Sequence, residues 1–270
     1  MDPIDQNAPL PVVAVQQRVS AKLPAEIQTA RGAARVPRPP TRRARPTRAK
    51  ILDAAERLFA HRGFHGVSIR EITRAAGVDV ALANYHFGSK KGLFEAVFVR
   101  RAELLNAERM ELLEIVLADA SGSGPSVEAV IDAFTRPLVH RSARGGPGWK
   151  AYFALVAQVN NSPELARVAM TKYYDPVVHK FIDALRSTLP RCDESDLYWS
   201  YHFLSGALTL TFAETGRIDN LSGGVCRSTD LDGVHQRLVP FIAAGFRALC
   251  ARAAQSARAG KRSSKTRRRG

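Results

Sequence analysis

Apolar residues recur at spacings of three and four along most of the chain, which predicts helices and gives no sign of strand alternation. The first helix is expected over residues 47–62, with Gly63 ending it. Its buried stripe comprises Ile51, Ala55, Leu58 and Phe59. A much longer helix is expected from about 90 to 117. Its stripe comprises Phe94, Val97, Phe98, Arg101, Leu104, Leu105, Glu108, Leu112 and Ile115.

The stretch between these two helices predicts two short helices joined by a tight turn. Ser68 and Glu71 have the spacing of a capping box, and Gly77 can end the first short helix with a positive φ. Asp79 is a suitable N-cap for the second short helix, as is Ser89 for the long helix. This order of elements is the outline of a helix-turn-helix unit, whose second helix fits a DNA major groove.

The second half of the chain is also expected to be helical, after a break at SGSGPS, residues 121–126. The predicted helices span about 126–142, 147–160, 163–189, 193–217 and 233–256, with a long loop at 220–233. Pro176 falls inside the third of these helices and should bend it, because proline removes one backbone hydrogen bond. The chain is therefore predicted to be all-α.

Residues 47–97 resemble the DNA-binding domain of the TetR family of bacterial repressors. The resemblance rests on AAERLFAHRGF in the first helix, SIREITRAAGV in the second and NYHFGSKKGLF across the third and into the fourth. Beyond about residue 105 only the helix pattern and the length agree. The resemblance implies an N-terminal helix-turn-helix domain, joined by the long helix to a C-terminal helical domain that binds an effector and dimerises.

The implied function is a cytoplasmic, ligand-responsive regulator rather than an enzyme, and it needs no cofactor. Such a repressor binds a palindromic DNA operator as a homodimer and is released by a small hydrophobic effector. In the family, the effector tilts the long helix and spreads the two recognition helices. Two alternatives stay open: a DNA-binding architectural protein without a small-molecule trigger, and an enzyme or interaction scaffold that uses the same helical fold.

Basic residues are concentrated at the two ends of the chain. Residues 31–50 carry eight Arg or Lys and residues 252–270 carry eight more, with no acid in either stretch. We expect a disordered basic Pro/Arg-rich arm at 1–46, the DNA-binding domain at 47–98, the effector-binding and dimerisation domain at 99–256 and a disordered basic tail at 257–270. The arms would bind DNA phosphates, and the first could follow a minor groove. Alternatively, they only aid solubility or bind RNA loosely.

Five side chains are expected to contact base edges: Arg70, Val80, Ala81, Leu82 and Asn84. The resemblance implies a base contact for Arg70, and a guanidinium suits guanine O6 and N7. Asn84 can pair with adenine, and the apolar side chains can contact a thymine methyl group. Ala83 and Phe87 should instead face the core. The alternative for Arg70 is a surface ion pair with a neighbouring acid.

Four further side chains are expected to contact phosphates: Ser68, Tyr85, His86 and Lys90. Such contacts fix the register of a protein on DNA rather than its sequence preference. The resemblance implies this role for Tyr85, His86 and Lys90. Capping alone would explain Ser68, and the ring of Tyr85 could also pack partly into the core.

Apolar stripes on the last two predicted helices suggest a dimer interface that comprises Leu197, Tyr201, Leu204, Leu208, Phe212, Leu238, Phe241, Gly245 and Leu249. A two-fold partner would supply the second half-site contact. The alternative is that both stripes pack within one chain.

Aromatic residues with a few polar tips suggest an effector pocket among the earlier C-terminal helices. The candidates are Trp149, Tyr152, Phe153, Val156, Asn160, Tyr174, Val178 and Phe181. Their alternative role is core packing. NYHFGSKK and KYYDPVVHKFIDALR resemble a branch of the family that senses fatty acids or acyl-coenzyme A, which makes such a molecule the candidate effector.

Cys192, Cys226 and Cys250 are scattered and form no CxxC pair. We therefore expect reduced thiols, as in a cytoplasmic protein, rather than a disulfide or a metal site. No apolar run reaches the length of a membrane span, and the opening MDPIDQNAPL lacks a secretory pattern.

Asp175, His179 and Asp183 share one helix face at a spacing of four. They could coordinate a metal ion, but pairing and capping in solvent is the expected role. The catalytic motifs HExxH and GxSxG, the P-loop and the glycine-rich dinucleotide fingerprint are all missing from the sequence.

Overall fold

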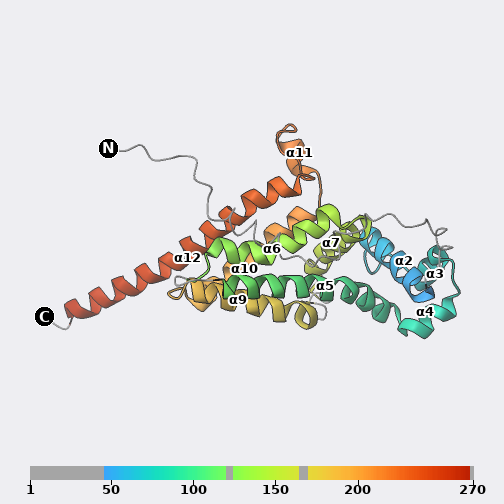
Figure 1. The fold of residues 1–270 in the computed structure, drawn as a ribbon, viewed down its shortest axis with the longest axis horizontal. Helices are drawn as coiled ribbons and strands as arrows, with labels where there is room; N and C mark the ends of the chain where they lie inside the picture. Colours follow the sequence, from blue (N-terminus) through green and yellow to red (C-terminus); the bar gives the residue numbers. More distant parts are fainter. Residues whose placement is uncertain (1–45, 120–123, 164–169, 268–270) are drawn as a thin grey trace, which may run out of the picture. The chain divides into compact units, whose positions relative to one another are not determined.

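The computed structural model describes residues 46–119, 124–163 and 170–267, with side chains up to residue 251. Within these ranges the chain forms helices and no strand, which confirms the predicted all-α class (Figure 1). No helix in the same ranges is both long and apolar enough to cross a membrane. The expectations for the N-terminal arm, up to residue 45, lie outside the described residues.

Four helices form the N-terminal part: α2 (Thr47–Arg62), α3 (Ile69–Ala76), α4 (Val80–Phe87) and the start of α5 (Lys90–Ala118). α2 packs against α3, α4 and α5 (Figure 1). Ile51, Phe59 and Ile72 are fully buried between them, and the Phe94 ring meets Phe59 edge to face with centroids 5.3 Å apart. This small apolar core fixes the angle between α3 and α4.

Local capping sets the ends of these helices as the sequence predicts. The Ser68 hydroxyl accepts from the Glu71 amide at 3.2 Å, and the Glu71 carboxylate accepts from the Ser68 amide at 2.8 Å. Gly77 ends α3 at φ 66° and ψ 41°, a left-handed conformation that a β-carbon would disfavour. Asp79 caps α4 through the Ala81 amide, and Ser89 caps α5. The helix-turn-helix is thus specified by its own short segment.

The buried face of α5 follows the predicted stripe only in its first half. Phe94, Val97 and Phe98 are buried, as expected. Further along, the buried positions are Ala102, Leu105, Asn106, Arg109 and Leu113. Leu104, which the stripe included, is exposed. The predicted stripe was wrong there because it assigned Asn106 and Arg109 to the surface. Both side chains are buried and donate hydrogen bonds to backbone carbonyl groups.

The C-terminal part contains α6 (Val127–Arg144), α7 (Pro147–Asn160), α9 (Asp175–Thr188), α10 (Glu194–Phe212), α11 (Arg217–Leu221) and α12 (Leu231–Arg267). α6 packs against α5 and α12, and α10 packs against α7, α9 and α12 (Figure 1). In the core of the C-terminal part, the rings of Phe134 and Phe181 stack with centroids 4.1 Å apart, and those of Phe153 and Phe212 stack at 4.7 Å.

Pro176 lies in the first turn of α9, after a turn at Tyr174, and not inside one long helix. The prediction of a bent helix over 163–189 is therefore wrong at this point. A proline in the first turn loses no intrahelical bond, because the amide it lacks would have no partner there.

The last three helices also differ from their predicted bounds. α10 ends at Phe212 rather than near 217, since Glu214 and Gly216 both adopt positive φ. The short helix α11 occupies the start of the predicted loop. α12 continues to Arg267, past the expected end near 256. The added stretch contains no proline and is rich in Ala, Arg and Lys, which favour helix.

Cys192 and Cys250 form a disulfide, with Cα atoms 4.4 Å apart. The expectation of three reduced thiols is therefore wrong for these two, and only Cys226 is a free, exposed thiol. Fifty-eight positions separate the bonded cysteines. Their proximity depends on how the segment before α10 packs on α12, which spacing along the chain does not reveal.

Candidate nucleic-acid interface and effector cavity

α4 turns one side inward and the other outward. Ala83 is buried against α2 and α5, and Phe87 is half-buried beneath the Arg48 guanidinium. Four residues are exposed on the other side: Ala81, Leu82, Asn84 and Tyr85. Val80, at the start of α4, is half-buried and offers less surface than predicted. The outward side thus combines small apolar groups with one amide and one phenol.

Arg70 lies in the first turn of α3, and its side chain is exposed. It forms no ion pair with any residue that the structure describes; Glu71 pairs instead with Arg62, at 2.8 Å. The alternative role of Arg70, a surface ion pair with a neighbouring acid, is therefore not found among the described residues. The guanidinium of Arg70 is thus exposed on α3, the helix that precedes α4.

The carboxylate of Glu71 holds the first turn of α3 together. The hydroxyl and amide of Ser68, and then Arg62, lower the pKa of Glu71 from 4.5 to about 2. The Ser68 hydroxyl donates its only proton to Glu71 at 2.7 Å. Because a phosphate contact needs that proton, Ser68 is better explained as a cap than as a phosphate ligand.

The other expected phosphate ligands lie near the end of α4 and the start of α5. Tyr85 is 82 % exposed, and its ring meets the half-buried His86 ring edge to face. The Lys90 ammonium lies 4.5 Å from the centroid of the Phe64 ring. Tyr85, His86 and Lys90 are near one another in the sequence and none of them is buried, so they can form one contact surface. Their contact with DNA stays a prediction.

The predicted dimer interface is largely wrong in its residues. Leu197, Leu204, Leu208, Phe212 and Leu238 are buried within the chain, and Tyr201 and Leu249 are half-buried. A side chain that its own chain covers cannot contact a second copy. Phe241 and Gly245 are exposed, as an interface requires. The intrachain alternative is therefore correct for most of this set.

A different set of apolar residues is exposed on α10 and α12. Its large members are Tyr198, Trp199, Phe203, Leu210 and Phe241. Phe241 is 75 % exposed and Leu210 is 66 % exposed. We call this set the exposed apolar face. It lies on the same helices as the predicted interface but on the opposite side of α10. That these helices pair two chains stays a prediction.

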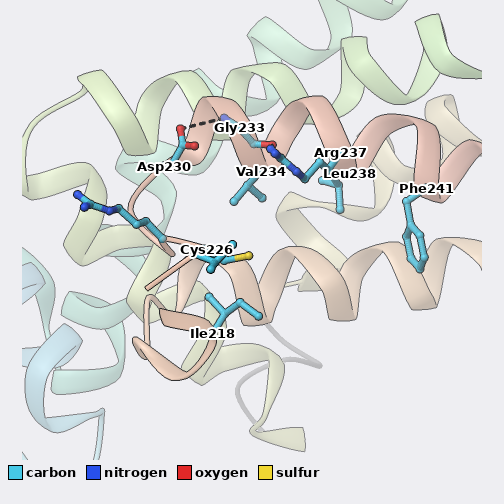
Figure 2. A pocket seen from close by; sticks show the side chains of 10 residues that line it. Ile218, Cys226, Asp230, Gly233, Val234, Arg237, Leu238 and Phe241 are labelled. Carbon is cyan, nitrogen blue, oxygen red and sulfur yellow. Dashed lines mark hydrogen bonds between the residues drawn. The ribbon is translucent and has the colours of Figure 1, made fainter. Parts of the chain in front are cut away.

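A groove of about 560 Å³ adjoins this face between α11 and α12. Figure 2 shows Ile218 on one side and Val234, Leu238 and Phe241 on the other. Cys226 lies in the loop between them, and Asp230 accepts from the Gly233 amide at 3.1 Å. Sequence reasoning missed this groove because it treated residues 220–233 as an unstructured loop.

Half of the predicted effector residues line a cavity among α5, α6, α7, α10 and the residues just before α9. Phe153, Val156, Asn160 and Tyr174 line it. The other four, Trp149, Tyr152, Val178 and Phe181, are buried in the core and do not line it. The cavity holds about 60 Å³. This volume suits a few atoms, whereas pockets for whole ligands are about 300–1,000 Å³.

Sequence reasoning missed Arg109, which lines the same cavity and is only 2 % exposed. Helical spacing could have found it, because Arg109 follows Ala102 and Leu105 at seven and four residues and precedes Leu113 by four. The predicted stripe included the neighbouring Glu108 and not Arg109.

Asp175, His179 and Asp183, for which pairing and capping was the expected role, all lie in α9. Among the described residues no group of three His, Cys, Asp or Glu side chains could hold a metal ion. Asp183 pairs instead with Arg186, three residues along α9.

Two family models match this chain. One, described as "Bacterial regulatory proteins, tetR family", matches residues 51–97. The other, "Tetracyclin repressor-like, C-terminal domain", matches residues 132–245. The chain belongs to the TetR family.

Curated relatives share mainly the N-terminal part. The "HTH-type transcriptional regulator UidR" of Escherichia coli (strain K12) is 34% identical over 71 residues, which is 26% of this chain and 36% of that protein. The "HTH-type transcriptional regulatory protein RaaS" of Mycobacterium tuberculosis (strain ATCC 25618 / H37Rv) is 52% identical over 48 residues, 18% and 22% of the two chains. The matched stretches thus span well under two thirds of these relatives. Both are transcriptional regulators by name, not enzymes.

A solved structure extends the likeness to most of the fold. The "fatty acid degradation regulator FadR from Bacillus halodurans" matches with a TM-score of 0.52 and 16% identity, covering 72% of this chain and 95% of that one. At this identity the match shows a shared TetR fold and nothing about the effector.

In this TetR family protein, α7 contacts the DNA-binding part directly. α7 packs on α2, and the Gln158 side-chain amide donates to the Ala60 carbonyl at 2.6 Å. Glu56 of α2 is buried and accepts hydrogen bonds from Arg100 and Arg101 of α5. Because α7 also lines the cavity, these contacts connect the cavity to the helix-turn-helix without passing along the whole length of α5.

Proposed function

We propose that this chain is a transcription regulator that binds a palindromic DNA operator as a dimer and is released by a small apolar effector. The observation that carries the proposal is the outward side of α4. It exposes Leu82, Asn84 and Tyr85, while Ala83 on the opposite side is buried. A helix held by its underside and exposed along its other side is free to enter a major groove.

Base reading would fall to Arg70, Ala81, Leu82 and Asn84, with a smaller part for the half-buried Val80. Arg70 would pair with guanine and Asn84 with adenine, since each offers two hydrogen-bonding atoms at the right spacing. Tyr85, His86 and Lys90 would contact phosphates and set the register. Ser68 would act by capping α3, which orients Arg70 beside α4.

Pairing of two chains would use the exposed apolar face and the adjoining groove. Large aromatic and aliphatic side chains exposed on two neighbouring helices are stabilised when a second copy covers them. The groove between α11 and α12 is continuous with that face, because Phe241 belongs to both. To read two adjacent half-sites, a dimer formed there must hold its two α4 helices about 34 Å apart.

The effector would enter the cavity that Phe153, Val156, Asn160 and Tyr174 line. An apolar ligand of the fatty-acid type needs more room than about 60 Å³, so binding would push α7 outward. Movement of α7 would pull on Gln158 and on the contacts around Glu56, and thereby tilt α2 with the DNA-binding part. The family's tilt of the long helix α5 would accompany this movement, since Arg100 and Arg101 belong to α5.

One observation favours a second candidate, a DNA-binding protein without a small-molecule trigger. The cavity is small in this conformation, and a closed cavity is what a chain without an effector would retain. A gel shift separates the two candidates, using duplex DNA from upstream of the protein's own gene, with and without fatty acids and acyl-coenzyme A. A shift that a ligand reverses supports the first, a shift that no ligand reverses supports the second, and no shift at moderate salt contradicts both.

A further inference from the structure

Arg109 is buried on the inner side of α5 with its guanidinium beside the cavity. Nε donates to the Phe134 carbonyl at 2.9 Å, and Nη1 donates to the Asn106 side-chain oxygen at 3.3 Å. Nη2 has no hydrogen-bond partner among the described residues. In those residues every fully buried side-chain nitrogen has a partner, so Nη2 is not fully buried. Nη2 therefore reaches open space, which the cavity provides.

The charge of Arg109 is not balanced by a carboxylate. It forms no ion pair with the residues whose side chains are described. Burial lowers the pKa of Arg109 from 12.5 to about 10, so the side chain remains a cation at neutral pH. Asp175 lies near Tyr201 but makes neither a hydrogen bond nor an ion pair with Arg109. The Phe134 ring, whose centroid lies 3.5 Å from Arg109 Cζ, offsets part of the cost of burying this cation, and an anion beside it would offset more.

The hydroxyl groups near Arg109 do not supply that anion. Burial raises the pKa of Tyr152 well above 10, that of Tyr174 to about 12, and that of Tyr201 above its usual value. All three phenols are therefore neutral at neutral pH. Tyr152 donates its hydroxyl proton to Tyr174, whereas Tyr174 and Tyr201, which both line the cavity, can donate hydrogen bonds to an anion.

We propose that Arg109 binds the carboxylate of an apolar organic acid, whose body lies among Phe134, Phe153, Leu208 and Phe212. Nη2 would hold one carboxylate oxygen, and a tyrosine hydroxyl the other. The inference rests on the proposed function and narrows its effector to a free acid. Coenzyme A thioesters carry several phosphate charges, whereas Arg109 is the one cationic side chain among the described residues that line the cavity.

The test uses the intact protein without DNA, titrated calorimetrically with decanoate, 4-phenylbutyrate, their methyl esters and decanoyl-coenzyme A. At least one acid should bind about tenfold or more tightly than its ester, because the charged hydrogen bond is lost on esterification. Equal affinity within both acid–ester pairs, no binding of either acid, or binding of decanoyl-coenzyme A as tight as decanoate would each overturn the proposal.

Arg109→Gln should reduce acid affinity to that of the ester and leave ester affinity unchanged, while Arg109→Lys should retain part of the preference. Arg136→Gln, which removes a guanidinium from the outer ion pair with Asp132, is the matched control and should change neither affinity. An Arg109→Gln protein that keeps the acid preference contradicts the proposal.

Arg109 also holds the Phe134 carbonyl near Pro137, so its replacement could prevent folding. Wild-type protein then provides the test with carboxyl-labelled decanoate and carbon NMR. The bound acid should stay ionised at pH values where the free acid is protonated; a bound acid that titrates like the free one overturns the assignment. Failure of these tests with intact operator binding removes only this inference, whereas failure to bind DNA removes the proposed regulator.

Discussion

Arg101 of α5 donates two hydrogen bonds to the carboxylate of Glu56 in α2. The same guanidinium lies 4.9 Å from the centroid of the Trp149 ring in α7. Arg101, a residue of the long helix α5, thus contacts both α2 of the DNA-binding part and α7, which lines the cavity. Gly148 leaves the room for this arrangement, since a β-carbon there would lie 2.1 Å from Arg101 Nη2.

Glu56→Gln should destabilise the fold and weaken the response to effector. The substitution leaves the Arg100 and Arg101 guanidinium groups without their buried carboxylate, and removing one partner of such a pair costs about 2–4 kcal/mol when the other charges are partly solvated. The free energy of unfolding in urea measures the loss. Asp183→Asn, which breaks an exposed pair with Arg186, should cost less than about 1 kcal/mol. Equal losses in the two variants would contradict a stabilising role for the buried Glu56 carboxylate.

The Cys192–Cys250 disulfide should contribute substantially to stability. It closes a loop of 58 residues, for which the loss of unfolded-state freedom corresponds to about 4 kcal/mol. A reducing agent, or Cys192→Ser, should therefore lower the denaturation midpoint. Cys226→Ser should leave it unchanged, because that thiol is exposed and unbonded. A midpoint insensitive to reduction would mean that the bond adds nothing to the folded state.

Glu71 should titrate near pH 2 rather than near 4.5. Its pKa is lowered because the charged carboxylate accepts hydrogen bonds from Ser68 and pairs with Arg62. Because the pKa is lower in the folded state, the contribution of the charged Glu71 carboxylate to folding stability is complete above pH 4.5. It is lost as the pH falls from 4.5 toward 2. Carboxyl carbon NMR of the intact protein measures the titration. Ser68→Ala should move it back toward 4.5; a wild-type value already near 4.5 would show that the capping box does not hold the charge.

Phe241→Asp should convert a dimer into a monomer. Phe241 belongs both to the exposed apolar face and to the adjoining groove, and a carboxylate buried there without a partner opposes pairing. Sedimentation velocity measures the change. Leu82→Asp adds the same charge on α4 and should leave the dimer intact, since Leu82 is exposed and does not belong to the exposed apolar face. A monomeric wild-type protein, or a Phe241→Asp protein that remains dimeric, would exclude this face.

The N-terminal part could be predicted from sequence because its signals are local. Ser68, Gly77, Asp79 and Ser89 each fix a helix end through contacts within four residues, so the chain segment carries the information itself. The inward position of Ala83 followed from the same short-range geometry.

The C-terminal part was harder because its helices are apolar on more than one side. α10 carries Leu197, Leu204 and Leu208 on one side and Trp199 and Phe203 on another, and only the packing against α7, α9 and α12 decides which side is buried. Periodicity identifies such a helix but does not orient it.

Interactions between distant segments were not predictable from spacing either. The disulfide joins positions 58 residues apart, and Arg109 of α5 meets a carbonyl of α6. A buried arginine contradicts the usual placement of charge at the surface. It becomes intelligible only when its acceptors and the cavity beside it are known.

Selection of bound duplexes from a randomised DNA pool tests most directly whether α3 and α4 read bases. Wild-type protein should recover a palindrome with two half-sites. Arg70→Ala should relax the preference at one base pair in each half-site, whereas Lys90→Ala should weaken binding to all sequences alike and reduce its salt dependence by about one unit of slope. Recovery of no shared sequence by the wild type, or an Arg70→Ala protein weakened equally on every sequence, would contradict the account.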